Sequence, residues 1–575
     1  MKYIPAIIEN GTAHCRDCYR CIRSCPVKAI KVVDGRTFVD DDRCIRCGAC
    51  VKACPQGSKV IDTDIDEVKA AIAEGKTIFA SVDSSYSAAF IEKRTNKVPD
   101  ALRKLGFKYV EETADAGELI RAEVQKMEFH TGILHNCPAA TNYIEKYMPE
   151  MKDKFLPITS ANIIHARMIR QVMGEDCLIC SIVPCAARIS EARRVENEGL
   201  IDFVITFRDL LLWMLTEDIQ INDCEDSEFD YICLTKERTK GAGITPLEGG
   251  MLHCAGYLES SLKNDFARHM TGQIDSVLKS IRDEDIPGIF ELSMCEGGCI
   301  SGCGYPYKHE SKFRRWKSVM NHAVERKALP AVEVQHPELR EMDISMRFET
   351  RPVELKTPSD EEIAEVLKKI GSKSGGKLYN CGACGYATCR DKAIAVLQGM
   401  AEIEMCLPYM RAMSKQRMDK ITETLPCGVV ILDHDLRIVY MNPTFKSLFF
   451  CDNNILGRHI SYLISAESYE KVMDGETLCE SIRTKYGVKY KESVYELQDE
   501  RQYVGIYVDI SDMKMDNAKL SILQRQILDQ MNEMRKREVD FALQLSQMIG
   551  VKTAENERIL SHFIDILEQN SNTER

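Results

Sequence analysis

The chain has 575 residues, of which 44% are hydrophobic and 29% charged, and its net charge is −12 at pH 7. This length is enough for roughly four domains, and the acidic balance argues against a general nucleic-acid binder or a membrane-surface protein. No apolar run reaches the roughly 18 residues of a membrane span, and the first ten residues do not have the regions of a secretory signal. We therefore expect the 25 cysteines to be reduced in the cytoplasm and spaced as cluster ligands, not as a disulfide framework.

Two copies of one cysteine pattern fill the N-terminal region, residues 1–62. Each copy reads Cys-x2-Cys-x2-Cys-x3-Cys-Pro, the bacterial ferredoxin run in which the fourth cysteine ligates the other cluster. Zinc sites or disulfides are the alternatives to clusters. The pattern predicts a ferredoxin-like domain for one-electron transfer, with one [4Fe–4S] cluster on Cys15, Cys18, Cys21 and Cys54 and a second on Cys44, Cys47, Cys50 and Cys25.

The next region, residues 63–345, alternates between short apolar runs and helical patterns. The runs at 77–82, 109–110, 178–184 and 203–206 read as strands, and residues 88–105 read as a helical stretch. Such alternation predicts α/β layers whose parallel strands are buried on both faces. Cys177 and Cys180 fall inside one of these strands, so we expect them to be buried structural cysteines.

Three cysteine motifs lie where these strands end: residues 136–138, 183–191 and 291–306. Thiolates prefer soft metals, and glycines, which are frequent in the third motif, let a backbone approach a bulky cluster. The carboxyl ends of parallel strands are where such sheets present their sites.

Together the three motifs resemble those of the [FeFe]-hydrogenase large subunit. The resemblance implies that a [4Fe–4S] cluster is held by Cys137, Cys185, Cys295 and Cys299. It also implies that Cys299 bridges this cluster to a two-iron unit with CO, CN⁻ and dithiolate ligands, the whole forming an H-cluster.

Four positions of these motifs are of interest for catalysis. Asn136 takes the place of the cysteine that passes protons in catalytic members, and an amide does not titrate near pH 7. Arg188 replaces a lysine, Glu191 is retained as a partner for that cation, and Ser293 replaces a methionine. We interpret these changes as a retained cluster with slowed or altered chemistry; neutral drift around a working centre is the alternative. Cys303 replaces a glycine. The sequence predicts two roles for it with equal weight, a small hydrophobic residue in a turn or a redox or proton-relay thiol.

Residues 346–412 contain a fourth cluster pattern. Thr357-Pro358 is expected to open a short helix to about Ile370. The spacing Cys-x2-Cys-x4-Cys-x16-Cys resembles a small single-cluster domain of corrinoid iron–sulfur proteins. It predicts a third accessory [4Fe–4S] cluster, with zinc as the alternative, on Cys381, Cys384, Cys389 and Cys406.

In residues 413–512 the sequence pattern changes and predicts a hairpin, a helix and three strands of alternating apolar residues. The hairpin spans 428–433 and 437–441, and Asn442-Pro443 forms an N-cap and first turn that opens a helix to about Phe450. Strands are expected near 481–486, 491–497 and 503–509. This order resembles a PAS sensor domain, and we assign it no cofactor.

The last region, residues 513–575, repeats apolar residues every seven positions, from Leu520 to Met548. The repeat predicts a coiled-coil-like signalling helix and a homodimer through the helix and the PAS region, and a helix folded back on its own chain is the alternative. Because the printed sequence shows no glycine-rich ATP site after this helix, we do not expect the chain itself to be a histidine kinase.

The sequence thus predicts a multidomain α/β and α+β protein: ferredoxin-like module, hydrogenase domain, small helical cluster domain, PAS domain and terminal helix. We expect a sensory [FeFe]-hydrogenase that binds or slowly oxidises H2 and exchanges electrons with a redox partner such as ferredoxin. Its downstream signalling partner would be a kinase, phosphatase or other signalling protein. The alternatives are a catalytic hydrogenase linked to ferredoxin or NAD(H), and an iron–sulfur regulator or scaffold without a two-iron unit.

Overall fold

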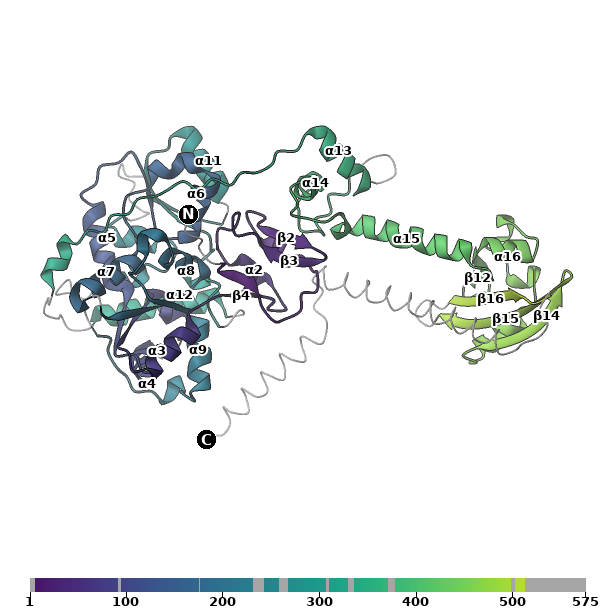
Figure 1. Cartoon of the computed structure of the whole chain (residues 1–575), viewed down its shortest axis with the longest axis horizontal. Coiled ribbons are helices and arrows are strands. Elements are labelled where there is room, and N and C mark those ends of the chain that lie inside the picture. The colour runs from purple at the N-terminus through teal and green to yellow at the C-terminus, as the bar shows by residue number, and fades with distance from the viewer. Residues whose placement is uncertain are drawn as a thin grey trace. The chain divides into compact units, whose positions relative to one another are not determined.

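The structure, a computed structural model, describes residues 6–91, 95–174, 176–230, 242–257, 267–272, 274–306, 310–328, 336–370, 378–497 and 502–511. The chain divides into two compact units: residues 1–364 with 384–402, and residues 365–383 with 403–575 (Figure 1). The five domains predicted from the sequence follow other bounds and remain a prediction. Over the described residues, no helix is both long and apolar enough to cross a membrane.

The N-terminal part of the first unit has two similar halves. Strand β1 (Ile8–Asn10) pairs antiparallel with β4 (Lys59–Ile61), and β2 (Ile30–Val33) pairs with β3 (Arg36–Val39). Between them lie two short helices, α1 (Arg20–Ser24) and α2 (Ala49–Ala53), each of which contains the third cysteine of its run. The predicted ferredoxin-like arrangement is confirmed.

A four-stranded parallel sheet follows, in the order β6-β5-β8-β9. Its strands are β5 (Ile78–Val82), β6 (Tyr109–Glu112), β8 (Leu178–Val183) and β9 (Phe203–Thr206). They confirm the four predicted strands. Cys180 lies fully buried inside β8, and Cys177 is buried just before it, as expected.

Helices cover both faces of this sheet, so its strands are buried on both sides. One face packs against α3 (Ile65–Ala73), α4 (Val98–Lys104) and α9 (Phe207–Thr216), and the other against α5 (Ala116–Val124) and α7 (Ala161–Met173). Figure 1 shows these two groups of helices apart from each other.

The helical stretch predicted over residues 88–105 is only partly correct. The structure has η1 (Ser84–Ala88), η2 (Thr95–Lys97) and then α4 (Val98–Lys104), while residues 92–94 lie outside the described part. Pro99 stands in the first turn of α4, where its missing N–H costs nothing and its fixed φ favours a helix start. The proline therefore opens a new helix instead of continuing an earlier one.

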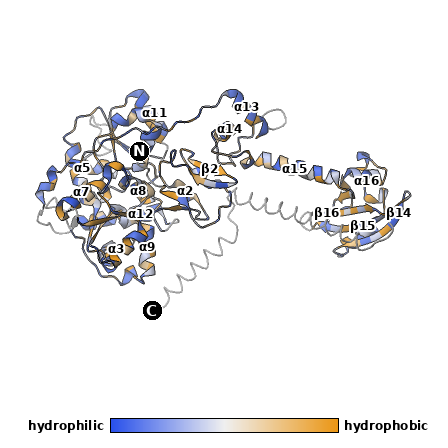
Figure 2. Ribbon diagram, viewed as in Figure 1, coloured by the Kyte–Doolittle hydropathy of each residue, from blue (hydrophilic) through white to orange (hydrophobic). Residues whose placement is uncertain are grey.

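A second, three-stranded parallel sheet has the order β10-β11-β7. Its strands are β7 (Thr131–Leu134), β10 (Ala267–Thr271) and β11 (Gly288–Ser293). Helices α6 (Pro138–Tyr147) and α11 (Ile274–Glu284) pack on it. In Figure 2 much of α11 is hydrophilic, because only one stripe of the helix, with Ile274, Leu278 and Ile281, is buried.

The remaining elements of this unit are short apart from α12 (Lys312–Ala328). They include α8 (Ala186–Ala192), α10 (Gly250–Cys254) and α14 (Cys389–Leu397). The 3-10 turns are η3 (Thr113–Asp115), η4 (Pro149–Lys154), η5 (Val195–Asn197), η6 (Ile221–Asp223), η7 (Ala242–Ile244), η8 (Gly298–Ser301) and η9 (Pro337–Glu341).

The helix expected after Thr357-Pro358 is present, but its start was predicted wrongly. Helix α13 runs from Asp360 to Lys369. Glu362 N–H donates to Ser359 Oγ (3.2 Å) and Ser359 N–H donates to Glu362 Oε2 (2.8 Å), so Ser359 caps the helix. This reciprocal pair satisfies two backbone donors at once, which a Thr-Pro start does not do.

The second unit contains a five-stranded antiparallel sheet in the order β13-β12-β16-β15-β14. After η10 (Ile403–Met405), α15 (Leu407–Thr424) precedes β12 (Gly428–Leu432), β13 (Ile438–Met441) and α16 (Pro443–Leu448). Then follow η11 (Asn453–Ile455), η12 (Ile460–Tyr462), α17 (Glu467–Met473), β14 (Cys479–Lys485), β15 (Val488–Leu497) and β16 (Gln502–Asp509).

These elements confirm the hairpin and the three strands predicted from the sequence. Asn442 caps α16 as predicted: its Oδ1 accepts from Phe445 N–H at 2.8 Å. The helix ends at Leu448, slightly earlier than expected. The predicted terminal helix, 513–575, and the homodimer it would form lie outside the described residues.

Candidate functional site

Three chain turns bring the cysteines of the three motifs to the carboxyl ends of parallel strands. Cys137 follows β7 and is the N-cap of α6, and Cys185 follows β8 and is the N-cap of α8. Cys295 and Cys299 follow β11, the latter within η8. Two different sheets therefore contribute, at the edge where such sheets hold ligands.

The four thiols lie close enough to interact electrostatically. The Cys299 thiol interacts with those of Cys137 and Cys295, and Cys185 interacts with Cys299 and Cys137. Burial raises the pKa of each of Cys137, Cys185 and Cys299. A cluster of buried thiols is costly to ionise unless a cation compensates the charge, so this donor set fits an iron–sulfur cluster. No disulfide joins any of the described cysteines.

Glycines of the third motif permit close contact with neighbouring backbone. Gly304 N–H donates to Pro184 O at 2.7 Å, and a Cβ added at Gly302 would lie 2.3 Å from the same oxygen. Gly298 has φ +78° and an added Cβ would lie 2.5 Å from Pro246 O. Only glycine fits these positions. Gly302 and Gly304 place the third motif directly against Pro184 of the second motif.

A buried ion network surrounds the second motif. Arg188 donates to Glu191 Oε2 at 2.8 Å and to the backbone oxygen of Asn136 at 2.8 Å. Its Nε lies 3.9 Å from Asp83 and makes no hydrogen bond with any described residue. Burial works against the charge of Arg188, yet Glu191, Cys299 and Asp83 raise its pKa. An unsatisfied, cationic donor beside buried thiols suits an anionic ligand such as cyanide.

Glu191 also binds His135, whose Nε2 lies 2.7 Å from Glu191 Oε1. Burial would raise the pKa of Glu191, but Arg188 and His135 lower it to about 2. The other ring nitrogen of His135 bonds to Thr141 Oγ1 at 2.6 Å. His135 is thus engaged on both sides, in a direction different from that of Asn136.

Asn136 directs its side-chain amide toward Glu291 in β11. Its Nδ2 donates to Glu291 Oε1 at 3.0 Å, and both side chains are buried. Ser293, near the end of the same strand, is also buried. The structure therefore brings Asn136, Arg188 and Glu191 into contact, with Ser293 on the strand that leads to Cys295.

Cys303 lies where the third motif meets the ferredoxin-like module. Ala186 N–H donates to its Sγ at 3.4 Å, and a Cβ added at Gly48 would lie 2.1 Å from that sulfur. Its thiol interacts electrostatically with Cys295 on one side and Cys50 on the other. Nearby, Lys52 Nζ donates to Ser301 O at 2.8 Å and lies 3.8 Å from Cys295 Sγ.

Within the ferredoxin-like module, the predicted exchange of the fourth cysteine stays a prediction, and the thiols of the two runs lie near one another. The Cys47 thiol interacts with Cys25, Cys44 and Cys50, although Cys25 belongs to the first run. Backbone N–H groups donate to three thiols: Ala29 to Cys25, Arg46 to Cys44 and Ser58 to Cys54, at 3.2–3.3 Å. Such donors stabilise thiolate sulfur. In the first group, Cys21 interacts with Cys18 and Cys15.

The segment 384–402 packs on this module's hairpin. Glu402 accepts from the N–H groups of Asp34 (2.5 Å) and Gly35 (3.1 Å), and Lys28 Nζ donates to Gly385 O at 3.1 Å. Cys384 and Cys389 belong to this segment, whereas Cys381 and Cys406 belong to the second unit. The four-cysteine site across them stays a prediction.

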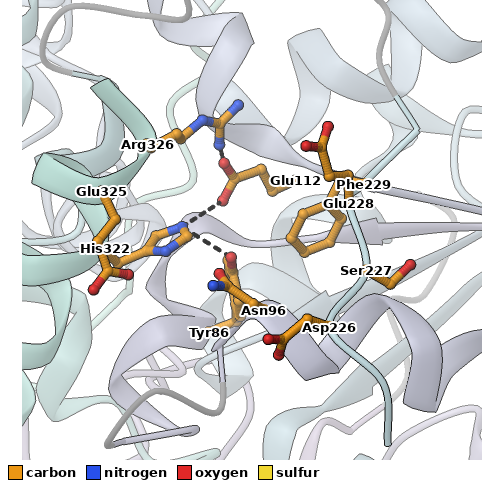
Figure 3. Close-up of a pocket in the computed structure, with 10 residues that line it drawn as sticks. All are labelled: Tyr86, Asn96, Glu112, Asp226, Ser227, Glu228, Phe229, His322, Glu325 and Arg326. Carbon is orange, nitrogen blue, oxygen red and sulfur yellow. Dashed lines mark hydrogen bonds and ion pairs between the residues drawn. The ribbon is translucent and has the colours of Figure 1, made fainter. Parts of the chain in front are cut away.

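A polar cavity of about 300 Å³ lies beside the four-stranded sheet (Figure 3). Tyr86 OH lies 2.9 Å from His322 Nε2, which is 3.6 Å from Glu112, and Glu112 pairs with Arg326. Burial lowers the pKa of His322 to about 4, so the ring is neutral at pH 7. Sequence reasoning missed this group because its members are up to 240 positions apart and form no motif.

Sequence reasoning also missed Asp83, Lys52 and Glu291. Asp83 ends a strand, and such a carboxylate is a recognisable signal at this edge of a sheet. Lys52 and Glu291 gave no signal, since each contacts a partner more than 150 positions away in the chain.

Four segments match the models of known families. Residues 7–61 match the 4Fe-4S dicluster domain, 76–303 the C-terminal domain of the iron-only hydrogenase large subunit, 379–408 an Fe-S cluster domain, and 416–503 the PAS fold. The chain is therefore a multidomain iron–sulfur protein. It contains the C-terminal domain of an [FeFe]-hydrogenase large subunit, preceded by a 4Fe-4S dicluster and followed by an Fe-S domain and a PAS domain.

Hydrogenases from three organisms are similar to the chain. The chain is 26% identical over 389 residues to the NADP-reducing hydrogenase subunit HndD of Solidesulfovibrio fructosivorans, covering 54% of this chain and 66% of that protein. It is 23% identical to iron hydrogenase 1 of Clostridium pasteurianum, covering 51% and 64%. The chain thus spans slightly under two thirds of the length of these relatives. The solved apo [FeFe]-hydrogenase HydA1 of Chlamydomonas reinhardtii matches at 16% identity and a TM-score of 0.40, covering 50% of this chain and 99% of HydA1.

Proposed function

We propose that this protein is a sensory [FeFe]-hydrogenase that binds or slowly oxidises H2 and reports the outcome through its PAS domain. The observation that carries the proposal is Asn136, an amide in the proton-relay position of a site that keeps its four cluster cysteines and Glu191. An amide bridges neighbours but does not take up and release protons at working pH. Slow turnover suits a detector, which should not consume its signal.

In this proposal Cys137, Cys185, Cys295 and Cys299 hold the [4Fe–4S] part of the H-cluster, and Cys299 also holds the two-iron unit. The two-iron unit, when bound, would supply an open metal position at which H2 is split into two protons and two electrons. Arg188 would donate hydrogen bonds to a cyanide ligand, and Glu191 keeps that guanidinium charged and oriented. Ser293, the last residue of β11, would line the site.

The electrons would leave one at a time through the accessory clusters. The contact of Cys303 with Gly48, and the bond from Lys52 to the third motif, support a direct route to the cluster of Cys25, Cys44, Cys47 and Cys50. The packing of residues 384–402 on the hairpin supports a further step to the third accessory cluster. A ferredoxin-type redox partner, and a kinase, phosphatase or other regulator, would complete the pathway.

The experiment is infrared spectroscopy and H2 turnover of the full chain matured with its two-iron unit. We expect CO and CN⁻ bands that respond to H2, together with turnover far below that of metabolic hydrogenases. Bands with fast turnover would favour the catalytic alternative, which the name of the NADP-reducing relative also suggests. Absence of the bands in fully cluster-loaded protein would leave an iron–sulfur regulator or scaffold.

A further inference from the structure

Glu291 is a fully buried carboxyl in β11, whose hydrogen bonds connect three parts of the hydrogenase domain. Its Oε2 accepts from Met251 N–H and Leu252 N–H in α10, each at 3.1 Å. Its Oε1 accepts from Asn136 Nδ2 at 3.0 Å. The side chain has no cation as a partner in the part of the chain that the structure describes. A buried carboxylate without a counter-charge is unusual, because ionised carboxyls are rarely buried unless paired.

These contacts assign different tasks to the two oxygens. Two backbone donors occupy Oε2, so a proton taken up by the carboxyl must go to Oε1, the atom that faces Asn136. An ionised carboxylate only accepts hydrogen bonds, whereas a protonated one also donates. An amide has a donor end and an acceptor end, and which of them faces a neighbour is determined by what that neighbour offers.

We propose that Glu291 is a positioning residue that determines, by its protonation, which end of the Asn136 amide faces the cluster pocket. With Glu291 ionised, Asn136 turns its NH2 group to Oε1 and its oxygen away, as the structure shows. With Glu291 protonated, its O–H donates to Asn136 Oδ1, and the amide rotates by half a turn to direct its NH2 group toward the pocket. This inference rests on the proposed function, since it takes the relay position of Asn136 from it.

Both forms of Glu291 are accessible near neutral pH. Burial raises the pKa of Glu291 to about 7, against the hydrogen bonds from Leu252, Asn136 and Met251. Glu248 raises it further. The other titratable groups around it are Cys254 of α10, which interacts with it, and His269 of β10, its partner in strand register. His269 itself lies 3.7 Å from Glu248.

The consequence for a detector is specific. A proton that reaches this part of the site would change a hydrogen-bond acceptor beside the reacting centre into a donor without passing through Asn136. The orientation of the Asn136 amide would then depend on the local proton concentration. Because protons are a product of H2 oxidation, the orientation would also respond to turnover. A thiol at position 136 has no such pair of ends, so the device depends on the asparagine.

The test is infrared spectroscopy of the full chain, matured with its two-iron unit, from about pH 5 to about pH 9. We expect a carboxylic acid band that titrates near pH 7, the value expected for Glu291, with CO and CN⁻ bands that shift over the same range. In Glu291→Gln both responses should disappear. In Asn136→Ala the carboxylic acid should still titrate, but the CO and CN⁻ bands should no longer follow it. Glu111→Gln, which alters another buried carboxyl of the domain, is the control and should keep both responses.

Three results would overturn the inference: no carboxyl titration near neutral pH, CO and CN⁻ shifts that persist in Glu291→Gln, or shifts that persist in Asn136→Ala. If no variant shows CO or CN⁻ bands, the proposed function fails instead. The inference is then decided in protein that carries only its cubanes. There the side-chain carbonyl band of Asn136, obtained as the difference from Asn136→Ala, must shift with the titration of Glu291 or the switch does not exist.

Discussion

At the scale of single residues, position 136 distinguishes the proposed detector from a catalytic enzyme, because it holds an asparagine where catalytic members have a cysteine. Proton delivery needs a group that gains and loses a proton within hydrogen-bond reach of the reacting centre. Such groups contribute about 10²–10⁴-fold in rate. We therefore expect Asn136→Cys to raise H2 turnover by about 100-fold or more, measured with an artificial electron acceptor at saturating H2.

Asn136→Ser is the matched control, because a hydroxyl has the size of a thiol but does not titrate at working pH. It should leave turnover close to that of the parent protein. If the parent already turns over at the rate of a metabolic hydrogenase and the cysteine adds nothing, the detector proposal loses its main support.

Glu191 is a second residue with a testable role, as the only carboxylate bonded to Arg188 among the described residues. Removing its charge takes away the hydrogen-bonded carboxylate of a buried guanidinium and leaves Asp83, 3.9 Å away, as its remaining carboxylate partner among the described residues. Breaking such a buried pair costs about 3–5 kcal/mol. We expect Glu191→Gln to lower the unfolding free energy of the hydrogenase domain by that amount. The midpoint of urea unfolding, followed by the fluorescence of Trp213 and Trp316, measures it.

The pH dependence of this pair has a definite sign. Because the pKa of Glu191 is lowered to about 2, its contribution is fully present above the unfolded value of about 4.3. The contribution should fall as the pH drops from there toward 2. In Glu74→Gln, which alters an exposed surface pair with Lys76, both the stability at neutral pH and the acid response should stay near those of the parent.

At the scale of elements, the third motif is held against the second by the absence of a side chain at Gly302. A methyl group there would meet Pro184 O at 2.3 Å, closer than any real Cβ contact, so the turn that carries Cys299 must move. In protein that carries its cubanes but no two-iron unit, Gly302→Ala should therefore lower the iron content by about four atoms per chain, the loss of one cubane. Iron analysis and electron paramagnetic resonance of reduced protein measure the loss.

Gly199→Ala separates this clash from a general effect of replacing glycine. Gly199 has a positive φ of +82° but open space around it, so alanine there is strained without touching a neighbour. It should cost stability of about 1 kcal/mol and no iron. Equal iron in Gly302→Ala and the parent protein would show that the two motifs do not need this contact.

Elements like these also show what the sequence could and could not predict. The ferredoxin-like arrangement, the buried strand with Cys180 and the Asn442 cap follow from local patterns, in which a few adjacent residues determine the outcome. The position of Ser359 as the cap of α13 was missed, because two neighbouring capping signals compete and only the reciprocal bond to Glu362 decides between them. Contacts such as Asn136 with Glu291 or Cys303 with Gly48 depend on how sheets and modules come together, and no local pattern encodes them.

At the scale of the whole molecule, the first unit joins two kinds of cluster site by direct contact. Lys146 of α6 donates to the backbone oxygens of Asp41, Asp42 and Cys44 at 2.7–3.0 Å, and burial lowers its pKa to about 8. With Lys52 on the other side, two cations tie the ferredoxin-like module to the hydrogenase domain. The module is therefore attached to the hydrogenase domain by direct contacts and is not loosely tethered to it.

The metal content of the whole chain tests how many iron–sulfur clusters it holds. Four cubanes and a two-iron unit amount to about eighteen irons per fully matured chain, whereas a structural zinc at Cys381, Cys384, Cys389 and Cys406 would leave about fourteen irons and one zinc. Because these ligands follow the spacing of a cluster domain and two of them lie on the segment that packs against the ferredoxin-like hairpin, we expect eighteen irons.

Cys389→Ser should then lose about four irons and the electron paramagnetic resonance signal of one cluster. Cys451→Ser, which alters a cysteine of the PAS region, should lose none. Stoichiometric zinc in the parent protein, released by Cys389→Ser with no change in iron, would end the electron path at the ferredoxin-like module and make residues 379–408 a structural joint.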